Sequence, residues 1–113
     1  MNSKYEGLLK KGVLEILVLQ LLSKKPMYGY QLILELKEMS HELFTLKEGT
    51  LYPILYRLED DGLLVSEWSQ PQGKSVSKKY YKITDEGKDT LINLRELWFR
   101  FSNEVQLILG DDK

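Results

Sequence analysis

Residues that build covalent and metal sites are absent or rare in this sequence of 113 residues. It has no cysteine, which excludes disulfide bridges and metal sites with thiolate ligands. Its one histidine, His41, lies between two predicted helices, where a lone histidine is usually only solvated. The acidic residues follow the pattern of solvated groups, and no nucleophile is paired with a base. We therefore expect neither an enzyme nor a bound cofactor or metal.

A long apolar segment is also missing. The longest apolar run, residues 12–22, contains Glu15 and Gln20 and is too short to span a bilayer. Lys10 and Lys11 are followed only by this short run, so no signal peptide is predicted. The chain is 42% hydrophobic and 29% charged, which suits a folded core. These features predict a cytoplasmic protein that makes no membrane contact.

The net charge of −1 is small for a protein that binds nucleic acid, but the charges are unevenly distributed. Residues 1–26 contain five lysines against two glutamates, and residues 63–84 contain four lysines against one glutamate. The other segments, including the C-terminal one, are acidic. The near-neutral total thus conceals two basic segments that could contact a polyanion.

The segment 47–62 (KEGTLYPILYRLEDDG) predicts the helix on which the functional interpretation depends. Its apolar residues recur at i, i+3, i+4 and i+7 and form one stripe: Leu51, Ile54, Leu55 and Leu58. The opposite face can form hydrogen bonds through Thr50, Tyr52, Tyr56 and Arg57. Lys47 and the free amides of the helix start favour an anion at one end, three acids repel it at the other, and Gly62 can end the helix. The pattern suits a recognition helix docked by its N-terminal half, although any surface helix has such a stripe.

The first residue of this helix stays open. Thr45 and Glu48 have the spacing of a capping box, which would start the helix at Thr45. Pro53 lacks the amide that would pair with the carbonyl of Gly49, and it is tolerated only near a first turn. The helix either begins later, at residues 48–50, or bends at Pro53.

Two helices are predicted upstream. Residues 8–22 are apolar on nearly every side, so we expect part of one continuous helix to meet another subunit. The second helix opens at residues 27–31 and runs to about Ser40, with four residues pointing inward: Leu32, Ile33, Leu36 and Met39. Tyr28 and Tyr30 flank a glycine at its start. We expect one of these tyrosines to contact a DNA phosphate and the other to pack under the helix.

A hairpin is predicted after segment 47–62. Residues 63–68 and 79–84 have strand character, and the residues between them are rich in turn formers. The tip carries three lysines: Lys74, Lys78 and Lys79. A basic hairpin directly after a recognition helix has the geometry of a wing that holds DNA phosphates. Lysines are also common on strand edges as protection against aggregation, so an ordinary solvated hairpin is the other interpretation.

The C-terminal segment predicts one long helix. Thr84 can cap it, Asp85 and Glu86 suit its first turn, and it is expected to end near Leu109. At ~1.5 Å per residue it is roughly 37 Å long, more than the preceding domain can cover. Apolar residues step by 3, 4, 3, 4 and 3, which is the seam of a coiled coil: Leu91, Leu94, Trp98, Phe101, Val105 and Ile108. We expect a homodimer through this seam, the alternative being a helix folded back on its own domain.

Four motifs occur in this order: MYGYQL at residues 27–32, GTLYPILYRLE at 49–59, GLL at 62–64 and KYYKITDEG at 79–87. Together they cover most of residues 27–87 and resemble the PadR family of bacterial transcriptional regulators. The resemblance implies a dimeric DNA-binding regulator. The single long final helix is similar to the short-tailed branch of that family, which includes regulators that sense flat aromatic drugs.

The resemblance also concerns Trp98. In that branch a tryptophan from each C-terminal helix holds the ligand at the dimer interface, and Trp98 stands in a similar place. The seam would bring two copies of Trp98, with Phe101 nearby, close to the dimer axis. There they would either bind a small planar aromatic effector or simply fill the dimer core.

The wing departs from the family pattern. Residues 73–79 (GKSVSKK) contain lysines where family wings often carry a glycine–arginine cluster. Lysine is a point charge without the planar fork of arginine. We therefore expect this wing to contact minor-groove phosphates and not to read bases.

The sequence predicts a mainly α fold with a small β-hairpin wing: a winged helix-turn-helix domain in residues 1–84 and a dimerisation helix in residues 85–113. The dimer, expected to be a repressor, would bind double-stranded DNA at a palindromic operator with half-sites ~34 Å apart. Base edges would be met by Lys47, Thr50, Tyr52 and Tyr56, and phosphates by Tyr28, Tyr30, Lys74, Lys78 and Lys79. The alternative is a winged-helix protein–protein adaptor that binds no DNA, which the low net charge favours.

Overall fold

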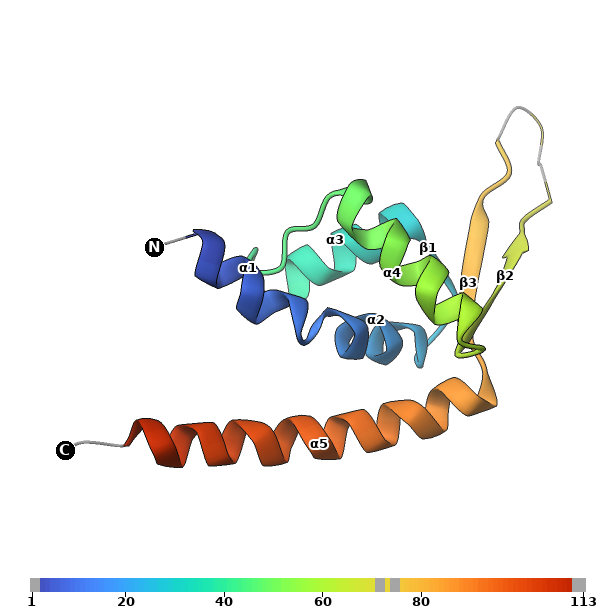
Figure 1. Ribbon diagram of the computed structural model, residues 1–113. Helices are drawn as coiled ribbons and strands as arrows, with labels where there is room; N and C mark the ends of the chain where they lie inside the picture. The colour runs from blue at the N-terminus through green and yellow to red at the C-terminus, as the bar shows by residue number, and fades with distance from the viewer. Residues whose placement is uncertain (1–2, 71–72, 74–75, 111–113) are drawn as a thin grey trace.

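The computed structural model describes residues 3–70, 73 and 76–110. Its helices are α1 (Ser3–Lys11), α2 (Leu14–Leu22), α3 (Gly29–Met39), α4 (Glu48–Asp60) and α5 (Asp85–Leu109). Its strands are β1 (Met27–Tyr28), β2 (Leu64–Trp68) and β3 (Lys79–Ile83). Helices α1 to α4 lie on one side of α5, and the hairpin of β2 and β3 projects beside α4 (Figure 1). The predicted mainly helical fold with a small hairpin wing is confirmed.

Helix α4 is placed by its apolar stripe. Leu51, Ile54, Leu55 and Leu58 are all buried, as predicted. The helix begins at Glu48 and includes Pro53, so the later of the two predicted starts is correct. The predicted capping box is wrong, because Lys47 occupies the cap position without a side-chain bond. The Thr45 hydroxyl instead donates to the carbonyl of Glu42, which completes the preceding turn.

The end of α4 is a tight glycine cap that leads directly into the hairpin. Gly62 has the left-handed φ of 80° that the sequence predicts. The Leu63 amide donates to the Leu58 carbonyl at 2.9 Å, and the Gly62 amide donates to the Glu59 carbonyl at 3.0 Å. This pair of bonds is a Schellman motif, and it fixes the angle between α4 and the wing.

The sheet is antiparallel, with the strand order β1-β3-β2. Ser66 of β2 and Met27 of β1 both pair with Tyr81 of β3. Strand β1 was not predicted, since residues 27 and 28 were assigned to the start of a helix and two residues are too short for a strand pattern. Helix α3 buries Leu32 and Leu36, but Met39, predicted to point inward, is 60% exposed because the helix ends there.

Residues 8–22 do not form the single helix that was predicted. The chain breaks at Gly12 and Val13 and divides the segment into α1 and α2. Glycine is a poor helix former, and the break lets α2 turn its apolar side chains into the core of its own chain. Leu8 and Leu9 of α1 remain 59% and 78% exposed. The uncovered apolar surface of this region therefore lies on α1.

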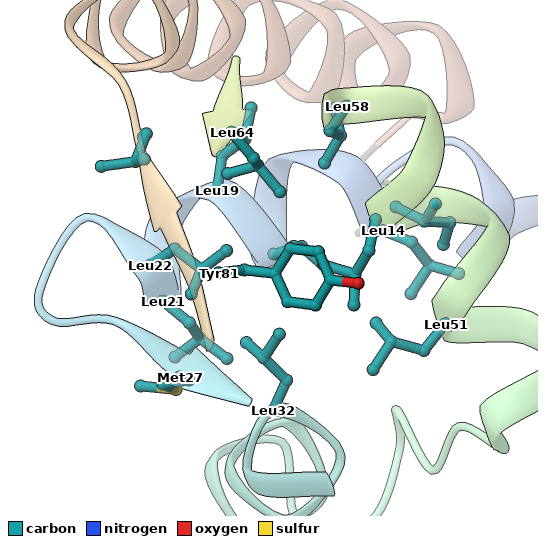
Figure 2. Close-up of a cluster of buried hydrophobic side chains, with 14 of the residues drawn as sticks. Leu14, Leu19, Leu21, Leu22, Met27, Leu32, Leu51, Leu58, Leu64 and Tyr81 are labelled. Carbon is teal, nitrogen blue, oxygen red and sulfur yellow. The ribbon is translucent and has the colours of Figure 1, made fainter. Parts of the chain in front are cut away.

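The core lies between α2, α3, α4 and the sheet. Figure 2 shows Tyr81 at its centre, with the ring extending from β3 toward α4 among buried leucines. Tyr81 is fully buried, as are Leu19, Leu32 and Leu55. The hydroxyl of Tyr81 has no hydrogen-bond partner among the described residues.

Helix α5 joins the described part of this core through its first turns. The Thr84 hydroxyl caps it by accepting from the Gly87 amide at 2.9 Å, as predicted. Leu91 is buried and Leu94 packs against the core, so the folded-back interpretation describes these turns. Farther along, Trp98, Phe101, Val105 and Ile108 are 43%, 58%, 52% and 85% exposed. None of the helices in the described ranges is both long and apolar enough to cross a membrane.

Candidate nucleic-acid interface

The outer face of α4 carries the polar groups that the sequence placed there. Lys47 and Thr50 are exposed near its start, and Tyr56, six residues after Thr50, is 51% exposed. Arg57 differs, because its guanidinium forms an ion pair with Glu15 of α2. Arg57 therefore links α4 to α2 while 52% of its side chain stays exposed, and the other predicted groups on this face are hydroxyls and one ammonium.

Tyr52 lies differently from its neighbours on α4. Its side chain is half-buried, and its hydroxyl rests against Gly29 at the start of α3, where a Cβ atom would collide with it. Burial, and secondarily Glu48 and Tyr56, raises the pKa of this phenol above its usual value. Gly29 thus makes room for Tyr52 at the junction of α3 and α4.

The lysines of the wing stand next to this face. The Ser69 amide donates to the Lys78 carbonyl and the Lys78 amide donates to the Ser69 hydroxyl, both at 2.8 Å, so the hairpin stays paired beyond its strands. The Lys78 ammonium lies 4.6 Å from the centre of the Tyr28 ring. The Lys79 ammonium lies 5.7 Å from the Tyr56 ring and 5.4 Å from the Tyr81 ring. Lys74, the third predicted lysine, lies outside the described residues.

The two tyrosines at the start of α3 are in different environments. Tyr28 is half-buried and packs edge-on against Tyr80, with ring centres 5.4 Å apart. Tyr30 is 57% exposed and free to contact a partner molecule. The structure thus places one tyrosine in packing and one at the surface.

A cavity of about 350 Å³ lies between α4 and the wing. It is lined by Tyr28, Tyr52, Tyr56, Trp68, Ser77, Lys78, Lys79 and Tyr81. Trp68, Ser77 and Tyr81 were not among the predicted site residues. The sequence could have indicated two of them. Trp68 pairs with Lys79, a predicted site residue, and Tyr81 lies two residues after Lys79 on the same face of the sheet.

A second, apolar groove of about 810 Å³ lies along α1, α2 and α5. Trp98 lines it together with Tyr5, Leu9, Leu17, Leu43 and Phe44. Phe101, predicted beside Trp98, is exposed on α5 and does not line this groove. Of the two predicted effector residues, Trp98 lines the apolar groove and Phe101 does not.

The arrangement of α3, α4 and the hairpin is that of a winged helix-turn-helix protein. The model of the PadR-like family of transcriptional regulators matches residues 18–93. The chain belongs to this family, as its motifs predicted.

Comparisons with individual relatives agree with this family membership. A PadR family regulator from Eggerthella lenta is 36% identical, with a TM-score of 0.85 over 97% of this chain and 93% of that one. A PadR-like transcription factor from Bacteroides fragilis is 36% identical, with a TM-score of 0.75 over 93% and 98%. The negative transcriptional regulator PadR of Bacillus subtilis is 34% identical over 79 residues, which are 70% of this chain and 43% of that protein. The chain is thus similar to transcriptional regulators over most of its length.

Proposed function

We propose that this chain is a homodimeric DNA-binding repressor that reads DNA with α4 and holds the backbone with its wing. One observation carries the proposal: Tyr52 and Tyr56 of α4 line the same cavity as Lys78 and Lys79 of the hairpin, and Lys47 and Thr50 are exposed near the start of that helix. The family supports regulation of transcription, and the Bacillus subtilis relative, named a negative regulator, supports repression.

The proposed contact residues fall into two groups: those that contact base edges and those that hold phosphates. Lys47, Thr50 and Tyr56 would meet base edges in the major groove, where hydroxyls and an ammonium can bond to acceptors. Tyr52 would take part mainly by placing α4, because its hydroxyl is turned to Gly29. Phosphates would be held by Tyr28, Tyr30, Lys74, Lys78 and Lys79. Operators of such dimers are approximately palindromic, with half-sites ~34 Å apart.

Dimerisation would use the distal part of α5. Four seam residues are exposed there, and Leu9 of α1 borders the apolar groove next to Trp98. A second copy of α5 could cover both surfaces, since exposed apolar area of this kind marks an interface. We accordingly assign residues 1–84 to DNA binding and residues 85–113 to dimerisation, with the first turns of α5 joining the two.

DNA selection followed by a salt titration tests the DNA-binding proposal. A duplex recovered from a random library should bind more weakly as salt rises, because bound lysines release counterions. Lys79→Ala should weaken binding to all sequences and flatten the salt slope by roughly one unit, whereas Thr50→Ala should reduce discrimination between sequences. Lys37→Ala, at the far end of α3, is the matched control. Failure to select any duplex would favour the protein–protein adaptor.

We further propose that a planar aromatic effector binds between the two Trp98 residues of the dimer. The support is that Trp98 is 43% exposed and faces an apolar groove. Such a ligand would release DNA only if it binds two arrangements of the helices with different affinity. In a Trp68→Phe background, planar cationic dyes should quench Trp98 in a saturable way, and Trp98→Ala should abolish the effect while the dimer persists. No quenching by any dye, together with a dimer that dissociates on Trp98→Ala, would make Trp98 purely structural.

A further inference from the structure

The cavity between α4 and the wing has walls of unusual composition. Tyr52 and Tyr56 of α4 form one side, Trp68 and Lys79 of the hairpin form the other, and Tyr81 belongs to the lining. Aromatic rings make the walls rigid, and Lys78, Lys79 and Ser77 supply donors at the rim. A cavity with these donors and no lining carboxylate is suited to a hydrogen-bond acceptor of negative charge.

The Tyr81 hydroxyl is the second observation. It is fully buried and has no partner among the described residues, although buried hydroxyls are normally paired. Burial, followed by Tyr56 and Glu59, raises the pKa of Tyr81 to about 12. The phenol is therefore protonated at physiological pH and can only gain from an acceptor that approaches it.

Lys78 and Lys79 of the wing are also without acidic partners among the described residues. Neither Lys78 nor Lys79 forms an ion pair within the described ranges, and both ammonium groups lie over tyrosine rings. Glu59 is the acid that acts on Tyr81, but its carboxylate accepts from the Ser66 hydroxyl and does not line the cavity. Two positive charges thus border a cavity whose lining also includes Tyr81, the residue with the unpaired hydroxyl.

We infer that this cavity is a phosphate-binding site that seats one backbone phosphodiester of bound DNA, with Tyr81 as a buried donor and Lys78 and Lys79 as counter-charges. The inference rests on the proposed function. When a helix occupies the major groove and a wing the neighbouring minor groove, the strand between the two grooves passes over the gap between helix and wing. In this protein that gap is the cavity, and its lining includes Tyr81, which the predicted phosphate contacts did not include.

Tyr81→Phe tests the site, because it removes the hydroxyl and keeps the ring. Affinity for the selected duplex should fall by about tenfold, and by the same factor for unrelated sequences, because a phosphate carries no sequence information. The melting temperature of the free protein should not fall, because the lost hydroxyl was unpaired. Tyr80→Phe is the matched control: Tyr80 is the preceding residue, on the opposite face of β3, and should change neither quantity.

Methylphosphonate substitution of the duplex locates the phosphate. Replacing phosphates one at a time by neutral methylphosphonates should reveal one position that weakens the wild type but causes no further loss in Tyr81→Phe. Free phosphate is the other source of the same chemistry, and Trp68 fluorescence in a Trp98→Phe background reports it. Saturation by inorganic phosphate, with no such methylphosphonate position, would overturn the assignment to DNA.

The remaining outcomes separate this inference from the proposed function. If the wild type binds DNA and Tyr81→Phe binds equally well but melts earlier, the hydroxyl has a structural role, such as holding a water, and only the inference fails. If the wild type binds no duplex, the proposed function fails and the inference fails with it.

Discussion

Helices α4 and α5 carry the same kind of apolar stripe, but the stripe of α4 is buried and most of the stripe of α5 is exposed. The four stripe residues of α4 are between 0% and 7% exposed, whereas the last four seam residues of α5 are between 43% and 85% exposed. Both stripes have the spacing of one helix face. Periodicity therefore predicts that a helix has an apolar face, but it does not predict whether that face is covered within the same chain.

The difference comes from what surrounds each helix. Helix α4 lies between α3 and the sheet, and its Schellman turn holds it to the wing. Beyond Leu94, the seam residues of α5 are at least 43% exposed, and Trp98 borders a groove with residues of α1 and α2. Interactions of α4 should thus depend on the fold alone, and those of distal α5 on a second molecule.

The largest expected effect is on the seam of α5. Val105→Glu would bury an unpaired carboxylate twice in a symmetric dimer, which costs several kcal/mol per ion, about enough to separate the subunits at micromolar concentration. Sedimentation should show a monomer with unchanged circular dichroism. Asn103→Glu, on the opposite face of α5, should remain a dimer. A wild-type chain that is already a folded monomer at this concentration would remove the basis for the dimer.

Leu55→Ala addresses the stripe of α4. Leu55 is 0% exposed, and removing a buried leucine side chain costs about 2–5 kcal/mol of unfolding free energy. Urea unfolding should give the same loss at every protein concentration. The matched change Val105→Ala should lower stability only where the protein is dimeric. A loss for Leu55→Ala that varied with concentration would mean that α4 also lies in a subunit interface.

Alkaline pH should lower the unfolding free energy through Tyr81, which packs against α4. The folded pKa of Tyr81 is about 12, above the usual value of 10.0 for the unfolded chain, so its contribution is complete below pH 10 and is lost as pH rises through 12. Two pKa units correspond to roughly 2–3 kcal/mol. Between pH 9 and 12, the unfolding free energy of the wild type should fall by this amount more than that of Tyr81→Phe. Parallel curves would show that Tyr81 ionises as freely in the fold as in the unfolded chain.

The smallest expected effect compares the ends of the two helices. Gly62 after α4 and Gly110 after α5 both have a φ of 80°. Gly62→Ala should cost about 1 kcal/mol, because alanine is strained at positive φ and the Schellman turn sets the wing. Gly110→Ala should cost less in thermal unfolding, since the end of α5 can fray without disturbing the core. Equal losses would imply that the end of α5 is as firmly packed as that of α4.

Most of the fold followed from local patterns in the sequence. The stripe of α4, the cap at Gly62, the hairpin and the Thr84 cap of α5 each depend on residues that are near one another in the chain. The break at Gly12 and Val13 was missed because a uniformly apolar segment has no periodicity to interrupt. Strand β1 was missed because its pairing with Tyr81 joins residues more than fifty positions apart.

The site was predictable to a smaller extent. The exposed positions of Thr50, Lys47 and Tyr56 follow from helix geometry once the buried stripe is known. The inward turn of Tyr52 does not, because it depends on the space above Gly29 in another helix. The cavity around Tyr81 likewise requires the packing of α4 on the sheet, which no local pattern contains.

The one-sided attachment of α5 makes this helix a lever. Leu91 is the last buried residue of this helix, and Ile108 lies 17 residues beyond, which at ~1.5 Å per residue is roughly 26 Å. A tilt of about 5° at the buried end would move the far end by roughly 2 Å, comparable to the helix shifts that operate known switches. Small changes of packing beside Trp98, which lies near the buried end of α5, are therefore converted into larger displacements at Ile108. Conversely, a second subunit bound to the C-terminal end of α5 would set the orientation of α4 and the wing.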